Sequence, residues 1–284
     1  MTTVVEAVEL RRTYKTTTIK MLITLLLHTS GEARVLGHNV VDNPREVRKR
    51  IGYVFGGDRG LYERLSAYDN LRYFAELYGV SGKAQRARID EVLELVGLKG
   101  REQERVEGYS RGMRQRLHIA RGLLHRPEVL FLDEPSIGID PVGARELRTT
   151  VAALVESGTT VLLTTHYMFE ADELCDRIAV IADGRIVAEG TPDALKSRVW
   201  QGGVLEIEVF GVADETVGSV RGVLGVRSVA VEERGHAQVL LVSIEPGAEV
   251  SGPVLNCLGG VRVGKVMSRA PTLEDAYAEL VRGG

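Results

Sequence analysis

Two adjacent carboxylates, Asp133 and Glu134, are the residues of this sequence best suited to chemistry. They follow an apolar run over residues 129–132, which predicts a strand buried on both faces. Sheets of α/β proteins bind ligands at the carboxyl ends of such strands. Because neighbouring side chains of a strand diverge, Asp133 could reach a hydrated Mg²⁺ while Glu134 deprotonates an attacking water. The alternative interpretation is a strand end that exposes two acids to solvent.

Three further segments surround this pair in chain order. Ser110 and Gly112 lie at the start of the helix that leads into the strand. Asp140 follows the strand, and His166 comes shortly after the next apolar run, over residues 160–163. A single histidine at a strand end is more often structural than catalytic. The ordered spacing of all these segments nevertheless favours one shared site.

The elements that must position these residues follow from the hydrophobic pattern. Apolar residues at helical spacing alternate with short β-branched runs, which predicts an α/β domain over residues 1–199. Ser66 is expected to cap a helix that Gly79 ends, and Asp140 is expected to cap another. Further along, the order of elements becomes β-α-β-β-α-β. This order is typical of a small α+β ferredoxin-like domain, here over residues 203–284.

Composition limits the partners and the compartment. The 284 residues carry a formal net charge of −3, so no nucleic-acid partner is expected. Cys175 and Cys257 lie far apart and match no metal or redox spacing, which favours a reducing compartment. Residues 1–8 lack the basic and apolar regions of a signal peptide. The longest apolar run, residues 21–27, is far shorter than the roughly 20 residues that cross a bilayer.

Residues 110–181 resemble the ATP-binding cassette of ABC transporters. The family's signature sequence is matched by Ser110 and Gly112, whereas Arg111 and Met113 depart from it. In the family, that serine and glycine lie at a helix N-terminus and bind the γ-phosphate of an ATP held by the opposite subunit. The helix dipole and free backbone N–H groups favour an anion there.

The resemblance extends to the acidic strand and to the histidine. Residues 130–134 resemble the family's Walker B strand, and Asp140 matches the aspartate of the loop that follows it. His166 matches the switch histidine, which contacts the γ-phosphate. Residues 8–14 resemble the family's first strand, with Tyr14 as the aromatic residue that stacks on adenine.

Lys15, Thr16 and Thr17 resemble the end of the family's phosphate-binding loop. The full pattern is G-x-x-x-x-G-K-[ST], in which backbone N–H groups wrap the phosphates. Residues 10–14 contain no glycine, so most of this loop is missing. Lys15 and Thr16 could still point at a phosphate and at Mg²⁺ from a helix N-terminus, as a weakened site. Two accounts stay open: a deletion variant or faulty gene model of an ATPase, or a protein with degraded nucleotide binding.

The resemblance implies an ABC-type ATPase subunit that binds ATP with Mg²⁺. It pairs with a second copy of itself and with an integral-membrane permease, and closure around ATP drives the permease. The catalytic residues that the resemblance implies are Glu134 and His166. The metal ligands that it implies are Thr16 and Asp133. The nucleotide-binding residues that it implies are Tyr14, Lys15, Thr16, Thr17, Ser110, Gly112 and Asp140.

The fold that the resemblance implies is a P-loop NTPase-like ABC ATPase domain with a truncated N-terminal part. Its helical subdomain is expected at about residues 60–126, and the ferredoxin-like domain follows it as an accessory unit. Because the missing segment removes a core strand, we expect residues 4–10 to slide into the vacant position of the central sheet.

Gly56 stands where the family usually has a metal-contacting glutamine. Such variants, together with an appended C-terminal domain, are features of bacterial drug and antibiotic-resistance exporters. This resemblance implies a cytoplasmic subunit, peripheral on the inner face of the cell membrane, with residues 56–100 facing the permease. One alternative is a non-hydrolysing remnant that docks on the membrane subunit without turnover. Another is a soluble ABC protein of DNA repair or translation, which tandem cassettes or long coiled-coil insertions would indicate; this sequence has neither.

Overall fold

The computed structural model describes residues 4–11, 18–57, 60–182, 184–199 and 202–282. The chain divides into two compact units, Met1–His166 and Tyr167–Gly284. Four residues of the predicted site, Tyr14, Lys15, Thr16 and Thr17, lie outside the described residues. In the part of the chain that the structure describes, no helix combines the length and the apolar character needed to span a membrane.

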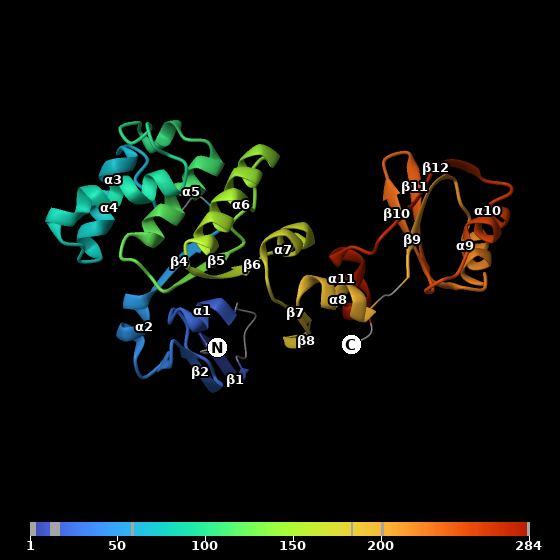
Figure 1. Ribbon diagram of the computed structural model, residues 1–284, viewed down its shortest axis with the longest axis horizontal. Helices are drawn as coiled ribbons and strands as arrows, with labels where there is room; N and C mark the ends of the chain where they lie inside the picture. The colour runs from blue at the N-terminus through green and yellow to red at the C-terminus, as the bar shows by residue number, and fades with distance from the viewer. Residues whose placement is uncertain (1–3, 12–17, 58–59, 183, 200–201, 283–284) are drawn as a thin grey trace. The chain divides into compact units, whose positions relative to one another are not determined.

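A parallel sheet forms the centre of the first unit (Figure 1). Its strands, in spatial order, are β4 (Ile51–Phe55), β5 (Val129–Asp133) and β6 (Thr160–Thr164). The middle strand is buried over residues 129–132, which confirms the prediction of a strand covered on both faces. Phe55, Asp133 and Thr164 stand in register at the carboxyl ends of the three strands. The ligand-binding edge of the sheet therefore brings the predicted acids beside the end of β6.

A separate antiparallel sheet precedes it in the chain. It consists of β1 (Val5–Arg11), β2 (Ser30–Val35) and β3 (His38–Asn39), accompanied by α1 (Thr18–Leu22) and α2 (Pro44–Arg50). The expectation that residues 4–10 enter the central sheet is wrong, because β1 pairs antiparallel with β2 and β4 pairs with β5 alone among the described strands. The physical reason is the edge of β2, whose backbone groups offer β1 a partner a short distance along the chain.

Four helices complete the first unit, together with a 3₁₀ turn over Val106–Gly108. They are α3 (Ala67–Leu77), α4 (Gly82–Leu95), α5 (Arg111–Leu123) and α6 (Pro141–Glu156). The predicted caps are confirmed: the Ser66 hydroxyl accepts from the Asp69 N–H at 3.0 Å, and Asp140 caps α6.

Two buried arginines tie α4 and α5 together. Arg88 of α4 donates to the carbonyls of Leu123 and Leu124 at the end of α5. Arg116 of α5 donates to the carbonyl of Val96, just beyond α4, at 3.1 Å. Each guanidinium thus supplies a cation and donors to the negative end of the neighbouring helix. These bonds connect the C-terminal end of each helix to a side chain of the other helix.

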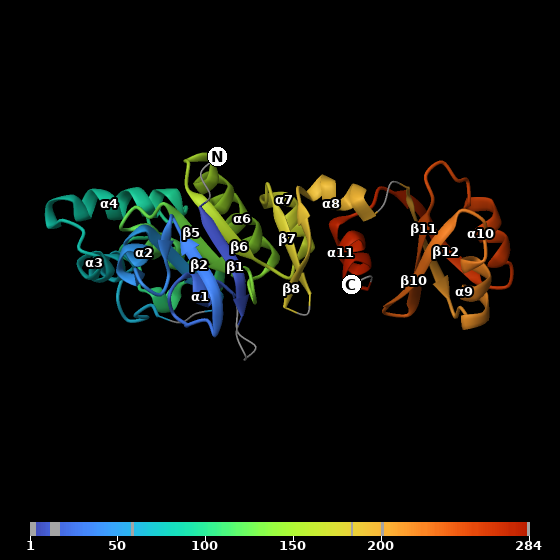
Figure 2. The same ribbon diagram turned by 90° about the horizontal axis from the view of Figure 1, so that it is seen from below.

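The second unit begins with α7 (Met168–Leu174), the hairpin of β7 (Ile178–Ala182) and β8 (Arg185–Gly190), and α8 (Pro192–Val199). A four-stranded antiparallel sheet follows, in the spatial order β10-β11-β9-β12. Its elements along the chain are β9 (Val204–Phe210), α9 (Asp214–Arg221), β10 (Val226–Arg234), β11 (Ala237–Ile244), α10 (Ser251–Cys257) and β12 (Arg262–Arg269). Figure 2 shows α9 and α10 on one face of this sheet, where the apolar residues of both helices and the strands share a core.

The last helix, α11 (Leu273–Arg282), does not stay with the sheet that precedes it. It packs against α7, α8 and β8, where Leu273 lies buried beside Ala171 and Val180 (Figures 1 and 2). The predicted boundary between residues 199 and 203 therefore falls inside the second compact unit. The reason is a tertiary contact between segments about a hundred residues apart, which no local pattern reports.

Candidate functional site

The carboxyl edge of the parallel sheet holds a hydrogen-bonded group of four residues. The Thr164 hydroxyl donates to Asp133 Oδ1 at 2.5 Å. The Glu134 N–H points at the same residue, 3.0 Å from the Thr164 carbonyl oxygen and 3.2 Å from its hydroxyl oxygen. His166 Nδ1 lies 2.5 Å from Glu134 Oε2. The structure therefore brings together Asp133, Glu134 and His166, as the sequence predicted for one shared site, and it adds Thr164.

Glu134 has an unusual backbone. Its φ of +51° lies in the left-handed region, which costs a residue with a side chain roughly 1–2 kcal/mol. Such conformations persist where surrounding contacts impose them, and they concentrate at functional sites. Here the turn separates the two acids, because Asp133 faces Thr164 while Glu134 faces His166. The two adjacent carboxylates therefore have different hydrogen-bond partners.

The Glu134–His166 pair is open to solvent. The Glu134 side chain is 33% exposed and the His166 side chain 54%. The contact joins Nδ1 of the His166 ring to one carboxylate oxygen of Glu134, Oε2. A carboxylate at this exposure can take a proton from water, and the imidazole can orient it.

Ser110 and Asp140 occupy matching positions at two helix N-termini. The Ser110 hydroxyl caps α5 by accepting from the Met113 N–H at 3.2 Å. Asp140 Oδ1 caps α6 by accepting from the N–H groups of Val142 and Gly143, at 3.1 and 3.0 Å. Both ends carry the positive end of a helix dipole, which favours an anion, and at α6 the carboxylate of Asp140 itself occupies this position.

A glycine pair holds these two N-termini side by side. A methyl group on Gly112 would lie 3.1 Å from the Cα of Gly143, so the two helix starts touch backbone to backbone. Arg111, which departs from the family's signature, donates from Nη1 to the carbonyl of Gly138 at 3.1 Å. That side chain therefore braces the segment between β5 and α6 instead of covering the start of α5.

The residues present fit a magnesium ion through Asp133. Its carboxylate accepts one bond from Thr164 and retains acceptor positions for a metal. Among the residues that the structure describes, no group of three or more His, Cys, Asp or Glu side chains is arranged to hold a metal. Mg²⁺ needs no such cage, because it keeps several waters and takes one or two carboxylates plus substrate phosphates.

Sequence reasoning missed two residues of this region, Thr164 and Gly143. Two threonines precede His166 in the sequence, but only the register of β5 with β6 shows that the Thr164 hydroxyl reaches Asp133. Gly143 lies three residues after the Asp140 cap, and its one sequence signal was a glycine in the first turn of a helix.

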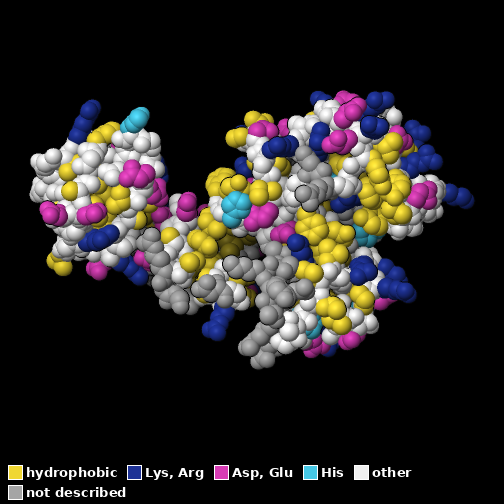
Figure 3. Space-filling model, turned by 180° about the vertical axis from the view of Figure 1, so that it is seen from behind, with side chains coloured by type: hydrophobic (Ala, Val, Ile, Leu, Met, Phe, Trp, Pro, Cys, Tyr) yellow, Lys and Arg dark blue, Asp and Glu magenta, His cyan; other side chains and the backbone are white. Residues whose placement is uncertain are grey.

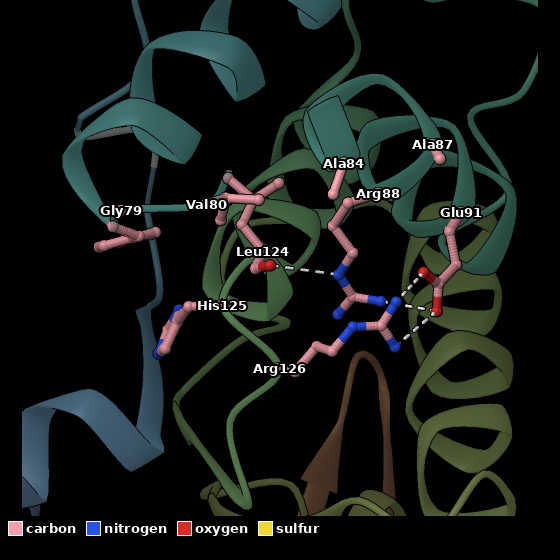
Figure 4. Close-up of a pocket in the computed structure, with 10 residues that line it drawn as sticks. Gly79, Val80, Ala84, Ala87, Arg88, Glu91, Leu124, His125 and Arg126 are labelled. Carbon is pink, nitrogen blue, oxygen red and sulfur yellow. Dashed lines mark hydrogen bonds and ion pairs between the residues drawn. The ribbon is translucent and has the colours of Figure 1, made fainter. Parts of the chain in front are cut away.

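A hollow elsewhere in the first unit is shown in Figure 4, between the end of α3, one face of α4 and residues 124–126. Arg88 and Arg126 both pair with Glu91, at 2.6 and 2.8 Å, and Arg88 Nε donates to the Leu124 carbonyl at 3.2 Å. The charged groups of Arg88, Arg126 and Glu91 are therefore paired with one another or with the backbone. We interpret these contacts as part of the packing of α4 on α5 and not as a binding site.

Comparisons with known proteins identify the fold. A solved structure described as the ATP binding subunit of an ABC transporter superposes with a TM-score of 0.59 at 25% identity, covering 69% of this chain and 93% of that one. A second, cbiO1 from Clostridium perfringens, gives 0.58 at 26% identity, with 63% and 73% covered. The fold is therefore that of the P-loop NTPases of the ABC ATPase type.

The sequence relatives define the family. Residues 15–137 match the ABC transporter family. The daunorubicin resistance ATP-binding protein DrrA3 of Streptomyces coeruleorubidus is 39% identical over 268 residues, which cover 94% of this chain and 83% of that protein. The linearmycin resistance ATP-binding protein LnrL of Bacillus subtilis is 37% identical, with 77% and 70% covered. The bacitracin transport ATP-binding protein BcrA of Bacillus licheniformis is 34% identical, with 95% and 85% covered. This chain belongs to the ABC transporter family. It is an ATP-binding subunit and an ABC-type ATPase.

Proposed function

We propose that this chain energises an ABC-type exporter of drugs or antibiotics by binding and hydrolysing ATP between two copies of itself. The observation that carries the proposal is the hydrogen-bonded group of Asp133, Thr164, Glu134 and His166 at the carboxyl edge of the sheet. The similarity to subunits named for daunorubicin resistance, linearmycin resistance and bacitracin transport supports the exporter class.

Within one copy, Glu134 is the general base and takes a proton from the attacking water. His166 orients that carboxylate in the free protein and turns to the γ-phosphate when a nucleotide is bound. Asp133, together with Thr16, would hold Mg²⁺, which would neutralise charge on the phosphate oxygens. Lys15 and Thr17 contribute to the phosphate site, and Tyr14 stacks on the adenine.

The second copy completes the site from its two helix N-termini. Ser110 and Gly112 at the start of α5 face the γ-phosphate held by the first copy, and Asp140 lies beside them at the start of α6. Support comes from the position of Ser110 and Gly112 at the positive end of the α5 dipole and from the contact between Gly112 and Gly143.

The domain boundaries belong to the same proposal. The ATPase domain covers residues 1–199, with its N-terminal part truncated ahead of Lys15 and its helical subdomain at about residues 60–126. Residues 203–284 form a ferredoxin-like accessory domain, which the element order and the strand order β10-β11-β9-β12 support.

The permease binds the helical subdomain over residues 56–100, which places the chain in the cytoplasm against the inner face of the membrane. Hydrophobic side chains gather on this part of the first unit in Figure 3, and the exposed ones there include Tyr62, Tyr73, Leu77 and Tyr78. Contiguous apolar patches of this kind mark interaction surfaces.

Replacement of Glu134 tests the proposal. Glu134→Gln keeps the shape of the side chain and removes its basicity, so ATP hydrolysis is expected to fall about 10²–10⁴-fold. Binding of a fluorescent ATP analogue is expected to stay at the wild-type level. Glu128→Gln is the matched control, because Glu128 is an exposed acid just before the opposite end of β5.

Equal hydrolysis rates in Glu134→Gln and the wild type would remove Glu134 from the mechanism. Failure of the wild-type chain to bind the analogue at millimolar concentration would instead favour the non-hydrolysing remnant that docks on the permease.

A further inference from the structure

The peptide group between Asp133 and Glu134 is hydrogen-bonded on both sides, to residues at the ends of the two neighbouring strands. On the β4 side, the Gly56 N–H donates to the Asp133 carbonyl at 2.7 Å. On the β6 side, Thr164 accepts the Glu134 N–H through its carbonyl oxygen at 3.0 Å and its hydroxyl oxygen at 3.2 Å. The same hydroxyl donates to Asp133 Oδ1 at 2.5 Å. One side-chain oxygen therefore contacts both the carboxylate of the first acid and the backbone of the second.

These contacts fix the peptide that precedes Glu134, so the φ of Glu134 sets the direction of its side chain. A residue other than glycine leaves this region unless its surroundings impose it. With φ at +51°, Glu134 directs its carboxylate to His166 Nδ1 at 2.5 Å. Relaxation of the backbone to an ordinary φ would swing the carboxylate away from the histidine.

Gly56, just beyond the end of β4, lies against the backbone of Glu134. A methyl group at position 56 would overlap the carbonyl oxygen of Glu134 and lie 2.7 Å from Cγ2 of Ile137. The space that a glutamine would need at this position is therefore occupied by the backbone of Glu134. The absence of a side chain at Gly56 and the left-handed backbone of Glu134 are therefore sterically matched.

We propose that Thr164 is a positioning residue for the reaction, which acts by holding Asp133 and the left-handed backbone of Glu134 at once, with Gly56 leaving room for the turn. The proposal rests on the roles assigned above to Asp133 and Glu134. Residues that orient a metal ligand or a general base through such hydrogen bonds change metal affinity or activity about 10–100-fold when removed.

Two substitutions of Thr164 distinguish the effect of its hydroxyl group from the effect of its size. Thr164→Val keeps the shape and removes the hydroxyl, whereas Thr164→Ser keeps the hydroxyl. Crystal structures of both full-length variants give the first readout. In Thr164→Ser, φ of Glu134 is expected to stay positive. In Thr164→Val the Glu134 backbone is expected to leave the left-handed region and its carboxylate to separate from His166. This readout needs no activity.

Kinetics give the second readout. In Thr164→Val we expect kcat for ATP hydrolysis to fall about 10–100-fold and half-activation by Mg²⁺ to need about tenfold more metal, with KM for ATP changed less than about threefold. Thr164→Ser is expected to stay within about threefold of the wild type. Thr160→Val, at the other end of β6, is the control and is expected to match the wild type.

A Thr164→Val protein with Glu134 unchanged in the crystal and with wild-type kcat would overturn the proposal. If Glu134→Gln hydrolyses ATP normally while Thr164→Val still moves the Glu134 backbone, the assigned chemistry fails and the positioning contact stands. Should Thr164→Val not fold, Gly56→Ala tests the same arrangement from the opposite strand. It is expected to displace Glu134 with the Thr164 hydroxyl intact, and an undisplaced Glu134 there would count against the proposal.

Discussion

At the scale of single residues, the helix that starts at Ser110 carries a buried, neutral histidine. His118 is 2% exposed, and its Nε2 has no hydrogen-bond partner among the described residues. Burial lowers the pKa of His118 to about 3, and the charge of Arg121 acts in the same direction. The folded protein therefore excludes a proton that the unfolded chain accepts at the ordinary pKa of about 6.5. Mild acid must weaken the helix that presents the candidate signature segment.

The sign of this pH dependence follows from the two pKa values. The stability contributed by neutral His118 is complete above pH 6.5 and is lost progressively as the pH falls toward 3. In that window, each unit by which the pH falls lowers the unfolding free energy by about 1.4 kcal/mol for this one histidine. His118→Met is expected to flatten the slope of unfolding free energy against pH by this amount, measured by urea denaturation between pH 7 and pH 5. His236→Met, in the exposed turn after β10, is the control, and equal slopes in both variants would refute the assignment.

At the scale of elements, the starts of α5 and α6 behave as one unit. Gly112 and Gly143 bring the two backbones into contact, and Arg116 of α5 pairs with Glu146 of α6 at 2.7 Å. Because Arg116 also donates to the carbonyl of Val96, the pair of helices is tied to the end of α4 as well. The two caps, and with them the backbone donors proposed to face a phosphate, are positioned by helix packing rather than by their own loops.

Gly143→Ala tests this contact. The added methyl group would lie 2.8 Å from Cγ2 of Ile139 and 3.2 Å from Oδ2 of Asp140, so one of them must shift. We expect the unfolding free energy to drop by about 1–3 kcal/mol, as for other overpacked sites. Gly82→Ala, in the first turn of α4 with nothing within 4 Å, is the matched control and should be neutral or slightly stabilising. Equal stability of the two variants in urea denaturation would mean that the helix starts are not in tight contact.

At the scale of the whole molecule, the last helix, α11, packs against α7, α8 and β8, which come about a hundred residues earlier in the chain. Helix α11 buries Leu273 among residues of α7, β7, β8 and α8, so the end of the accessory part packs on the stretch that directly follows His166. This contact explains why residues 167–199 cluster with the last third of the chain. It also makes the stability of α7 depend on the last helix of the chain.

Leu273→Ala is the corresponding prediction. Leu273 is 2% exposed, and removal of such a side chain costs about 2–5 kcal/mol through lost burial and the cavity left behind. Calorimetry of the full-length variant is expected to show a lower unfolding temperature. Val281→Ala, on the same helix but 39% exposed, should change it little. If the two variants unfold alike, α11 does not stabilise this part of the chain.

Local patterns were enough to predict much of this protein. The buried strand over residues 129–132 and the Ser66 and Asp140 caps depend on residues within a few positions of one another. The family could also be assigned from the order and spacing of short motifs. These features are set by side-chain periodicity and by hydrogen bonds that close within one turn.

Only the tertiary structure decided how those pieces meet. The contact of the Thr164 hydroxyl with Asp133 and the packing of α11 on α7 and α8 each join segments that are about 30 to 100 residues apart in the chain. The pairing of β1 with β2 and the left-handed backbone of Glu134 were likewise visible only in the structure. A sequence pattern records which face of an element is apolar but not which distant partner covers it. The site geometry is therefore a property of strand register and helix packing, since these determine which polar atoms come within hydrogen-bonding distance.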